Sequence, residues 1–147
     1  MAANKISVLY LDDEQDNLFS FMATFRLKFK VLTASSGEEA LKHVETKLFH
    51  VVVSDQRMPQ MTGVEFFEKM QEKCPDPIRV LLTGYADMNA VIDAVNKGKI
   101  FHYLSKPWNE EELTATIERA YVAWQDKQAL KDSNEQLEFL LRQKLLS

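Results

Sequence analysis

Short apolar runs alternate with longer amphipathic segments along the chain. The runs are rich in aliphatic and β-branched residues, which is typical of strands, and they cover 6–11, 30–34, 51–54, 78–83 and 100–105. Between and after them, apolar residues recur at three- and four-residue steps, which predicts helices over about 15–29, 37–48, 64–74, 88–98 and 110–125. This alternation predicts an α/β fold, a doubly wound five-stranded parallel sheet with five helices on its two faces.

Capping residues mark several helix ends. Ser36, with Glu39 three positions later, predicts a capping box at the start of the second helix. Asn109 is the expected N-cap of the last helix, and Gly98 is a natural C-terminal glycine for the fourth. The inner face of the second helix is predicted to carry Leu41, Val44 and Leu48.

The predicted domain covers residues 1–125, and a helical linker or tail covers 126–147. Lys127 and Lys144, at flanking positions of the tail's apolar seam, weaken a coiled-coil interpretation, so a helix folded back on its own domain or a frayed end is the alternative. We favour a dimerising tail that leads toward a partner or toward an output domain missing from this sequence. The seam follows three- and four-residue steps through Leu130, Asn134, Leu137 and Leu141.

The composition is that of an ordinary globular protein, with 46% hydrophobic residues, 27% charged residues and a formal net charge of −4. This acidic balance argues against a basic nucleic-acid binder or a polybasic membrane-surface protein, so we expect neither nucleic acid nor membrane as a direct partner. The single cysteine, Cys74, excludes an internal disulfide and a multi-cysteine zinc site. No apolar run approaches the roughly 20 residues that cross a bilayer. The first run ends in Asp12-Asp13, unlike a signal peptide, and we expect a cytoplasmic protein.

Polar side chains stand where the predicted strands end. Asp12 and Asp13 follow the first strand directly, and Asp55 follows the third. Thr83 ends the fourth strand, and Lys106 follows the fifth. Because the carboxyl ends of parallel strands share one edge of a sheet, we expect these side chains to converge on one site.

The converging groups suit magnesium and a phosphoryl group. Three carboxylates repel one another unless a cation joins them, and Mg²⁺ prefers oxygen ligands. The Thr83 hydroxyl and the Lys106 ammonium would give a phosphoryl group further partners. Asp55 is the best candidate nucleophile, because it lies centrally in the sheet and has no adjacent acid, and it would form an acyl phosphate. The three histidines are expected to be structural or surface residues: His43, His50 and His102.

The nucleotide-binding apparatus of a kinase is missing from the pattern. The chain has only four glycines and no glycine-rich phosphate loop. The phosphoryl group is therefore expected to come from another protein or from a small activated phosphodonor.

In combination these residues resemble the receiver domain of two-component response regulators, over about 6–125. The motifs that carry the resemblance are Asp12-Asp13, Asp55 within Val-Val-Val-Ser-Asp-Gln-Arg-Met-Pro, Met61-Thr62-Gly63, Thr83-Gly84 and Lys106-Pro107. The resemblance implies a flavodoxin-like strand order 2-1-3-4-5 and phosphorylation of Asp55 by a sensor histidine kinase or a phosphotransfer protein. It also implies Mg²⁺ held by Asp13, Asp55 and the backbone carbonyl of Arg57, with Asp12 assisting through water.

The resemblance further implies a switch. On phosphorylation, the Thr83 hydroxyl would turn to a phosphoryl oxygen, Tyr103 would swing inward, and Lys106, expected to precede a cis proline, would pair with the phosphate. The surface of the fourth helix, fifth strand and fifth helix would then control an output domain or effector protein, and a homodimer is a further expected assembly. The run 82–87 with Lys106-Pro107-Trp108 looks more like receivers of cyclic-di-nucleotide phosphodiesterases or hydrogenase-type regulators than like chemotaxis receivers.

The leading interpretation is thus a signalling module and not an enzyme. The alternative is an aspartyl-phosphate-forming hydrolase of the haloacid-dehalogenase type, which needs two acids separated by one residue after the first strand; here the pair is adjacent. A degenerate receiver used only as a scaffold is disfavoured, since all the site residues are present. Arg57 and Tyr85 each stand two positions beyond a site residue, and they either shield the acyl phosphate from water or point to solvent.

Overall fold

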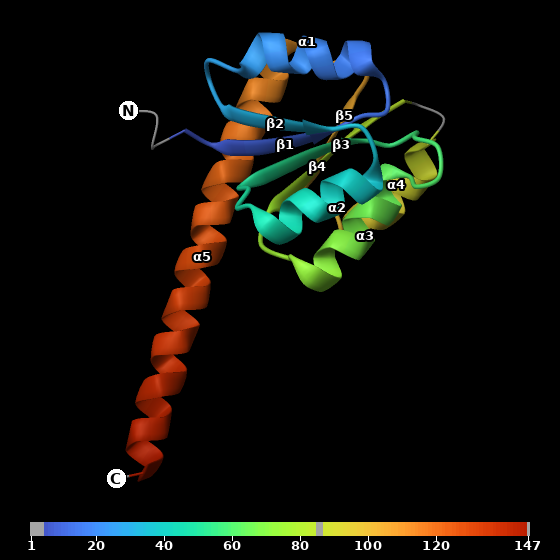
Figure 1. The fold of residues 1–147 in the computed structure, drawn as a ribbon. Helices are drawn as coiled ribbons and strands as arrows, with labels where there is room; N and C mark the ends of the chain where they lie inside the picture. The colour runs from blue at the N-terminus through green and yellow to red at the C-terminus, as the bar shows by residue number, and fades with distance from the viewer. Residues whose placement is uncertain (1–4, 85–86, 147) are drawn as a thin grey trace.

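The chain forms one sheet flanked by helices, and its last helix extends far beyond this layered domain (Figure 1). A computed structural model describes residues 5–84 and 87–146. Five parallel strands lie in the order β2-β1-β3-β4-β5, which confirms the predicted topology. The strands are β1 (Ser7–Leu11), β2 (Lys30–Ala34), β3 (Val51–Asp55), β4 (Ile78–Thr83) and β5 (His102–Ser105).

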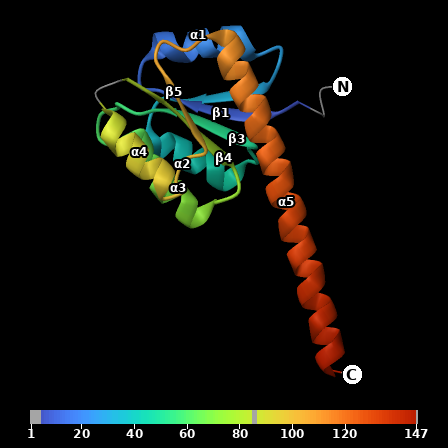
Figure 2. The same cartoon turned by 180° about the vertical axis from the view of Figure 1, so that it is seen from behind.

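Helices cover both faces of the sheet. The helices are α1 (Gln15–Phe25), α2 (Gly37–Thr46), α3 (Gly63–Lys73), α4 (Met88–Asn96) and α5 (Glu110–Leu146). Successive residues of a strand point to opposite faces, so β1 sends Val8 and Tyr10 to one core cluster and Leu9 and Leu11 to the other. The first cluster lies under α1 and the start of α5, and the second lies under α2, α3 and α4 (Figure 2).

The prediction that the first helix reaches residue 29 is wrong. α1 ends at Phe25, and residues 26–28 form a turn. Phe29 is nevertheless buried, because this turn returns the chain to the core just before Lys30 pairs with Ser7 in the sheet. An apolar residue at helical spacing therefore reached the core from a turn.

The inner face of α2 also differs from the prediction. Val44 is buried, but the side chain of Leu48 is 69% exposed. The helix ends at Thr46, and Lys47 is extended, so the chain turns Leu48 outward and places Phe49 in the core instead. The fifth strand likewise begins at His102, two residues later than predicted.

The predicted capping box at Ser36 forms only in part. Ser36 accepts a hydrogen bond from the Glu39 backbone N–H at 3.2 Å, but the Glu39 carboxylate bonds to Ser35 and not to the Ser36 backbone. A complete capping box lies at Thr62 and Glu65, where both reciprocal bonds measure 3.1 Å. Asn109 caps α5 as predicted, because its Oδ1 accepts a hydrogen bond from the Glu112 backbone N–H at 3.1 Å.

The last helix continues without a break from the domain into the tail. At the amino-terminal edge of the sheet, Tyr121 and Trp124 pack against the ring of His50 with centroid distances of 4.9 and 4.5 Å. Lys127 donates to the Pro75 carbonyl at 2.6 Å. Lys131 pairs with Asp76 at 3.4 Å, and beyond this contact the helix projects away from the domain rather than folding back on it (Figures 1 and 2). Within the residues described, no helix combines the length and apolar character that crossing a bilayer requires.

Candidate functional site

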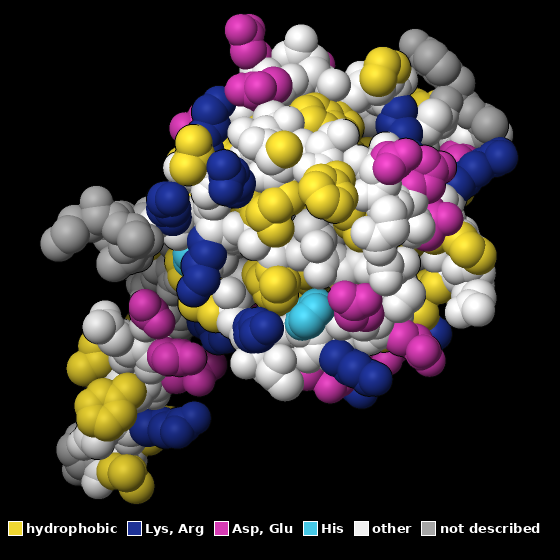
Figure 3. Space-filling view, turned by 45° about the horizontal axis from the view of Figure 1, so that its top comes forward, with side chains coloured by type: hydrophobic (Ala, Val, Ile, Leu, Met, Phe, Trp, Pro, Cys, Tyr) yellow, Lys and Arg dark blue, Asp and Glu magenta, His cyan; other side chains and the backbone are white. Residues whose placement is uncertain are grey.

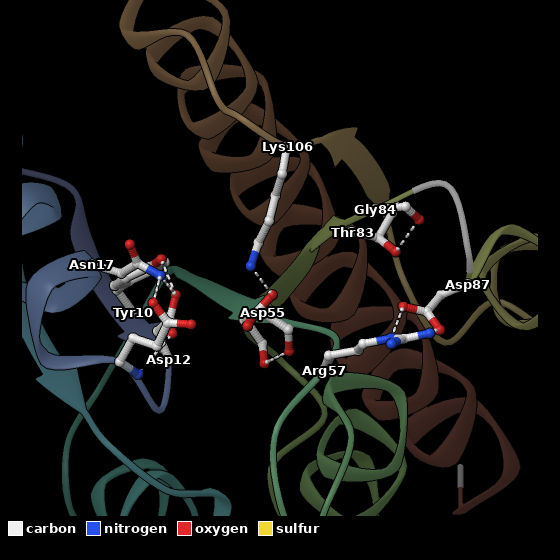
Figure 4. Close-up of polar contacts among 11 residues, drawn as sticks. Tyr10, Asp12, Asn17, Asp55, Arg57, Thr83, Gly84, Asp87 and Lys106 are labelled. Carbon is white, nitrogen blue, oxygen red and sulfur yellow. Dashed lines mark hydrogen bonds and ion pairs between the residues drawn. The ribbon is translucent and has the colours of Figure 1, made fainter.

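The strand-end residues lie together at the carboxyl edge of the sheet (Figure 4). Asp12 follows β1, and Asp55 is the last residue of β3. Asp55 is in register with Leu82 of β4, so Thr83 stands one residue beyond it. Lys106 is held there by its own backbone N–H, which donates to the Thr83 carbonyl at 2.9 Å. The topology thus brings residues from four strand ends to one site.

The acidic side chains form a cluster. One carboxylate oxygen each from Asp12, Asp13 and Asp55 lies within 4.8 Å of the others. Asp12 is completely buried, Asp55 is 4% exposed, and Asp13 is exposed. Closely spaced buried carboxylates are costly without a compensating cation, and an all-oxygen donor set fits Mg²⁺. The residues present therefore fit the ion that the sequence predicts.

Asp12 accepts hydrogen bonds from three directions. Its Oδ2 accepts from the Tyr10 hydroxyl at 2.7 Å and from the Asn17 amide at 3.1 Å. Its Oδ1 accepts from the Glu14 backbone N–H at 3.0 Å. Burial and the charge of Asp12 raise the pKa of Tyr10, so its hydroxyl keeps its proton and acts as the donor. Sequence reasoning missed Tyr10 and Asn17, although Tyr10, two strand positions before Asp12, shares its side of β1.

Asp55 pairs with Lys106 across the site (Figure 4). Burial raises the pKa of Asp55, the bond to Lys106 and its charge oppose that shift, and the charge of Asp12 adds to it. The net effect is a raised pKa, which means that the charge of this carboxylate is only partly compensated by the protein's own groups. A cavity of about 440 Å³ opens beside the pair and is lined by Tyr10, Asp12, Asn17, Lys106 and Trp108 among others.

The expected switch residues occupy defined positions. The Thr83 hydroxyl is buried and donates to the Gly84 carbonyl at 3.2 Å, not to the acidic cluster. Tyr103 is half-buried and packs against the core cluster under α2, α3 and α4. The Lys106-Pro107 peptide bond is cis, as the resemblance implied. The roles of Thr83 and Tyr103 in switching stay predictions.

Arg57 does not cover the site in this structure. Its guanidinium pairs with Asp87, with an Nε–Oδ2 distance of 3.2 Å, and it points away from Asp55 (Figure 4). Its side chain is 74% exposed. The shielding hypothesis for Arg57 thus finds no support in this position, and Tyr85 lies outside the described residues. Whether the Arg57 backbone carbonyl binds an ion stays a prediction.

Comparison with known proteins places these features in a family. The response regulator receiver domain model matches residues 8–118. The hydrogenase transcriptional regulatory protein HoxA of Cupriavidus necator is 34% identical over 142 residues, which cover 97% of this chain and 29% of that protein. HoxA of Bradyrhizobium diazoefficiens is 32% identical over 78% of this chain and 24% of its own length. This chain therefore spans less than a third of these curated relatives.

Solved structures show the same fold. A structure described as an adenylate cyclase from Rhodopirellula baltica has a TM-score of 0.83 and 29% identity to this chain. The alignment covers 91% of this chain and 98% of the chain in that structure. A response regulator receiver domain protein from Clostridium thermocellum has a TM-score of 0.77 and 30% identity, over 85% of this chain and 98% of its own.

Proposed function

This chain belongs to the response regulator receiver family. We propose that Asp55 is its phosphoacceptor and that it receives the phosphoryl group from a sensor histidine kinase or a phosphotransfer protein. The observation that carries the proposal is the position of Asp55, a nearly buried carboxylate placed between an acidic cluster and Lys106. A buried, partly compensated carboxylate of this kind is suited to nucleophilic attack on an activated phosphoryl group.

The transfer would use few groups. An Asp55 oxygen attacks the phosphorus, the new O–P bond forms, and the bond from phosphorus to the donor nitrogen breaks, with its electron pair remaining on the donor. Lys106, already paired with Asp55, would neutralise charge on the phosphoryl oxygens. Mg²⁺ would be held by Asp13, Asp55 and the Arg57 backbone carbonyl, with Asp12 acting through water, and it supplies further charge neutralisation when bound.

The proposed response runs from the site toward α4, β5 and α5. Among the residues that the structure describes, the partner of the Thr83 hydroxyl is the adjacent Gly84 carbonyl, and we propose that it exchanges this bond for one to a phosphoryl oxygen. Tyr103 would then move inward. The Arg57–Asp87 pair connects the loop after β3 with the residue that precedes α4, which gives the start of α4 a contact close to the phosphoacceptor.

The output is also part of the proposal. Two curated relatives are described as hydrogenase transcriptional regulators, so we propose that the switched surface controls transcription through an output domain or effector protein in the cytoplasm, without direct nucleic-acid contact by residues 1–125. The tail over 126–147 would connect the receiver to that output.

A small acyl phosphate, acetyl phosphate, supplied with MgCl₂ tests the function. We expect each chain to gain one hydroxylamine-sensitive phosphoryl group and to lose it slowly, and we expect no labelling when EDTA removes the metal. Intact-protein mass spectrometry measures the label, and a phosphate assay measures release. Continuous release of many phosphates per chain would support the hydrolase alternative, and no label under any condition would overturn the proposal.

The tail supports a second element of the proposal, a parallel homodimer. Leu130, Leu137 and Leu141 are 64%, 56% and 53% exposed, and they form with Asn134 a stripe that we name the tail seam. Hydrophobic side chains stand among charged ones on the projecting helix (Figure 3). With Asn134 at a core a position, Asp126 and Lys131 occupy positions g and e, which lie opposite each other across two parallel helices. Lys131 pairs with Asp76 of its own chain at 3.4 Å, so in the dimer it would exchange that partner for Asp126 of the second copy.

We expect Leu137→Glu to weaken this dimer at least tenfold in dissociation constant, because a charge would replace a core leucine in each helix. Sedimentation equilibrium of the phosphorylated full chain measures the association. Phe139→Glu is the matched control, since Phe139 is 61% exposed but lies outside the tail seam. Equal dissociation constants for both variants and the unchanged protein would contradict dimerisation through the tail seam.

A further inference from the structure

Tyr10 is a tyrosine buried in an otherwise apolar strand. It is 1% exposed, and its ring stacks on that of Phe21 with a centroid distance of 4.0 Å and an interplanar angle of 3°. Phe21 is fully buried and in turn packs against Phe25, which leaves the Tyr10 ring a fixed orientation. A buried hydroxyl needs a hydrogen-bond partner, and the partner here is Asp12 Oδ2 at 2.7 Å.

Neutral groups hold the charge of Asp12. Within residues 5–84 and 87–146, no lysine or arginine forms an ion pair with this carboxylate, although it is completely buried. Its partners are the Tyr10 hydroxyl, the Asn17 side-chain amide and the Glu14 backbone N–H. Lys106, the cation of the site, is paired with Asp55. The direction in which Asp12 presents its oxygens is therefore set by these three donors (Figure 4).

We propose that Tyr10, assisted by Asn17, is a positioning residue for the magnesium site: its hydroxyl holds the Asp12 carboxylate in the orientation that receives the hydrated ion beside Asp13 and Asp55. Two donors converge on one oxygen of Asp12 from different elements, Tyr10 from β1 and Asn17 from α1. Partners that orient direct metal ligands contribute about 10- to 100-fold to metal affinity in known sites. Because Asp12 would meet the ion through water, we expect Tyr10 to contribute at the lower end of that range. The inference rests on the proposed function, because it deepens the site at which that function takes place.

A purely structural role for Tyr10 predicts a different result. In that case its hydroxyl would only satisfy a buried carboxylate, and its removal would lower the thermal stability of the fold while leaving the magnesium affinity of the folded protein unchanged. The two roles therefore separate when affinity is measured directly on folded protein.

The test is a titration of the full chain with MgCl₂, followed by ¹H–¹⁵N NMR at constant ionic strength. Tyr10→Phe retains the stack on Phe21 and removes only the hydroxyl. We expect the dissociation constant for Mg²⁺ to rise roughly tenfold. Tyr121→Phe is the matched control, because it removes the same atoms from a tyrosine that packs on His50 at the opposite edge of the sheet, and we expect it to bind Mg²⁺ as the unchanged protein does.

Asn17→Ala provides a second test that does not depend on the folding of the first variant. Its amide donates to the same oxygen from a partly exposed position, so we expect a several-fold weaker affinity with the fold retained. Affinities in Tyr10→Phe and Asn17→Ala equal to that of the unchanged protein would overturn the inference, as would an equal loss in Tyr121→Phe. Failure of the unchanged protein to accept a label from acetyl phosphate would instead overturn the proposed function, so the two failures are distinguishable.

Discussion

Asp55→Asn is expected to reduce phosphoryl labelling by acetyl phosphate to background. The amide nearly preserves the size of the side chain, but it lacks the anionic oxygen that attacks phosphorus. Asp55 is also the acid in contact with Lys106, and within residues 5–84 and 87–146 neither Asp12 nor Asp13 forms an ion pair with that lysine. Circular dichroism would confirm that the variant is folded before labelling is measured.

The matched control for this loss is Asp76→Asn. Asp76 lies in the loop before β4, at the other edge of the sheet, where it pairs with Lys131 at 3.4 Å. We expect Asp76→Asn to accept one phosphoryl group per chain, as the unchanged protein does. Persistent labelling of Asp55→Asn would assign the acceptor to another residue, and Asp12 and Asp13 would be the first to examine. Loss of label in Asp55→Asn is expected for a switch and for a hydrolase alike. The amount of phosphate that the unchanged protein releases distinguishes the two, because a hydrolase releases many phosphates per chain.

Gly63→Ala is expected to destabilise the fold by about 1–3 kcal/mol and to slow the labelling of Asp55. A Cβ at Gly63 would lie 2.4 Å from the Asp55 backbone carbonyl oxygen, 2.7 Å from Leu81 Cδ1 and 3.1 Å from Ser54 Oγ. The carbonyl belongs to the strand that presents the phosphoacceptor, so relief of the clash must displace either the end of β3 or the start of α3. Helix propensity favours alanine over glycine, by at most about 1 kcal/mol at this first helical position, so a loss of stability is diagnostic of the clash.

Gly37→Ala tests this explanation in a matched position. Gly37 and Gly63 are each the first residue of a helix and follow a serine or threonine N-cap. A Cβ at Gly37 would meet the flexible Met61 side chain, with its sulfur at 2.5 Å, and not a backbone atom. We expect the free energy of unfolding to stay within about 1 kcal/mol of the unchanged protein in urea denaturation. Equal decreases in the free energy of unfolding for the two variants would show that the close approach of Gly63 to the Asp55 carbonyl does not determine stability.

The strands and the acidic site were predictable for the same reason. The run 78–83 matches β4 residue for residue, because buried parallel strands read as short apolar runs bounded by polar or turn residues. The run 30–34 matches β2, a partly buried edge strand that its β-branched and aliphatic residues identify. Once the strands are parallel, their carboxyl ends meet at one edge whatever the side-chain details. Asp12, Asp13 and Asp55 therefore converge as predicted.

The wrong predictions concern residues whose helical spacing in the sequence does not match their position in the fold. Phe29 and Leu48 both fit a helical stripe, yet the first is buried from a turn and the second is turned outward. In both cases the return of the chain to the next strand decides where the helix ends. The Arg57–Asp87 pair joins residues 30 positions apart, and no spacing rule relates them.

The order of hydrophobic and polar residues determined the element types and the identity of the acidic groups, since periodicity and the geometry of parallel strands depend only on position along the chain. The strand order was implied by the resemblance to receiver domains, and the structure confirms it. Only the tertiary structure decided which contacts surround the acidic groups. The Tyr10 ring stacks on Phe21, the Tyr10 hydroxyl donates to Asp12, and Arg57 forms an ion pair with Asp87. The Tyr10–Phe21 stack and the Arg57–Asp87 pair join residues 11 and 30 positions apart, so they depend on how the strands and helices pack and not on local sequence pattern.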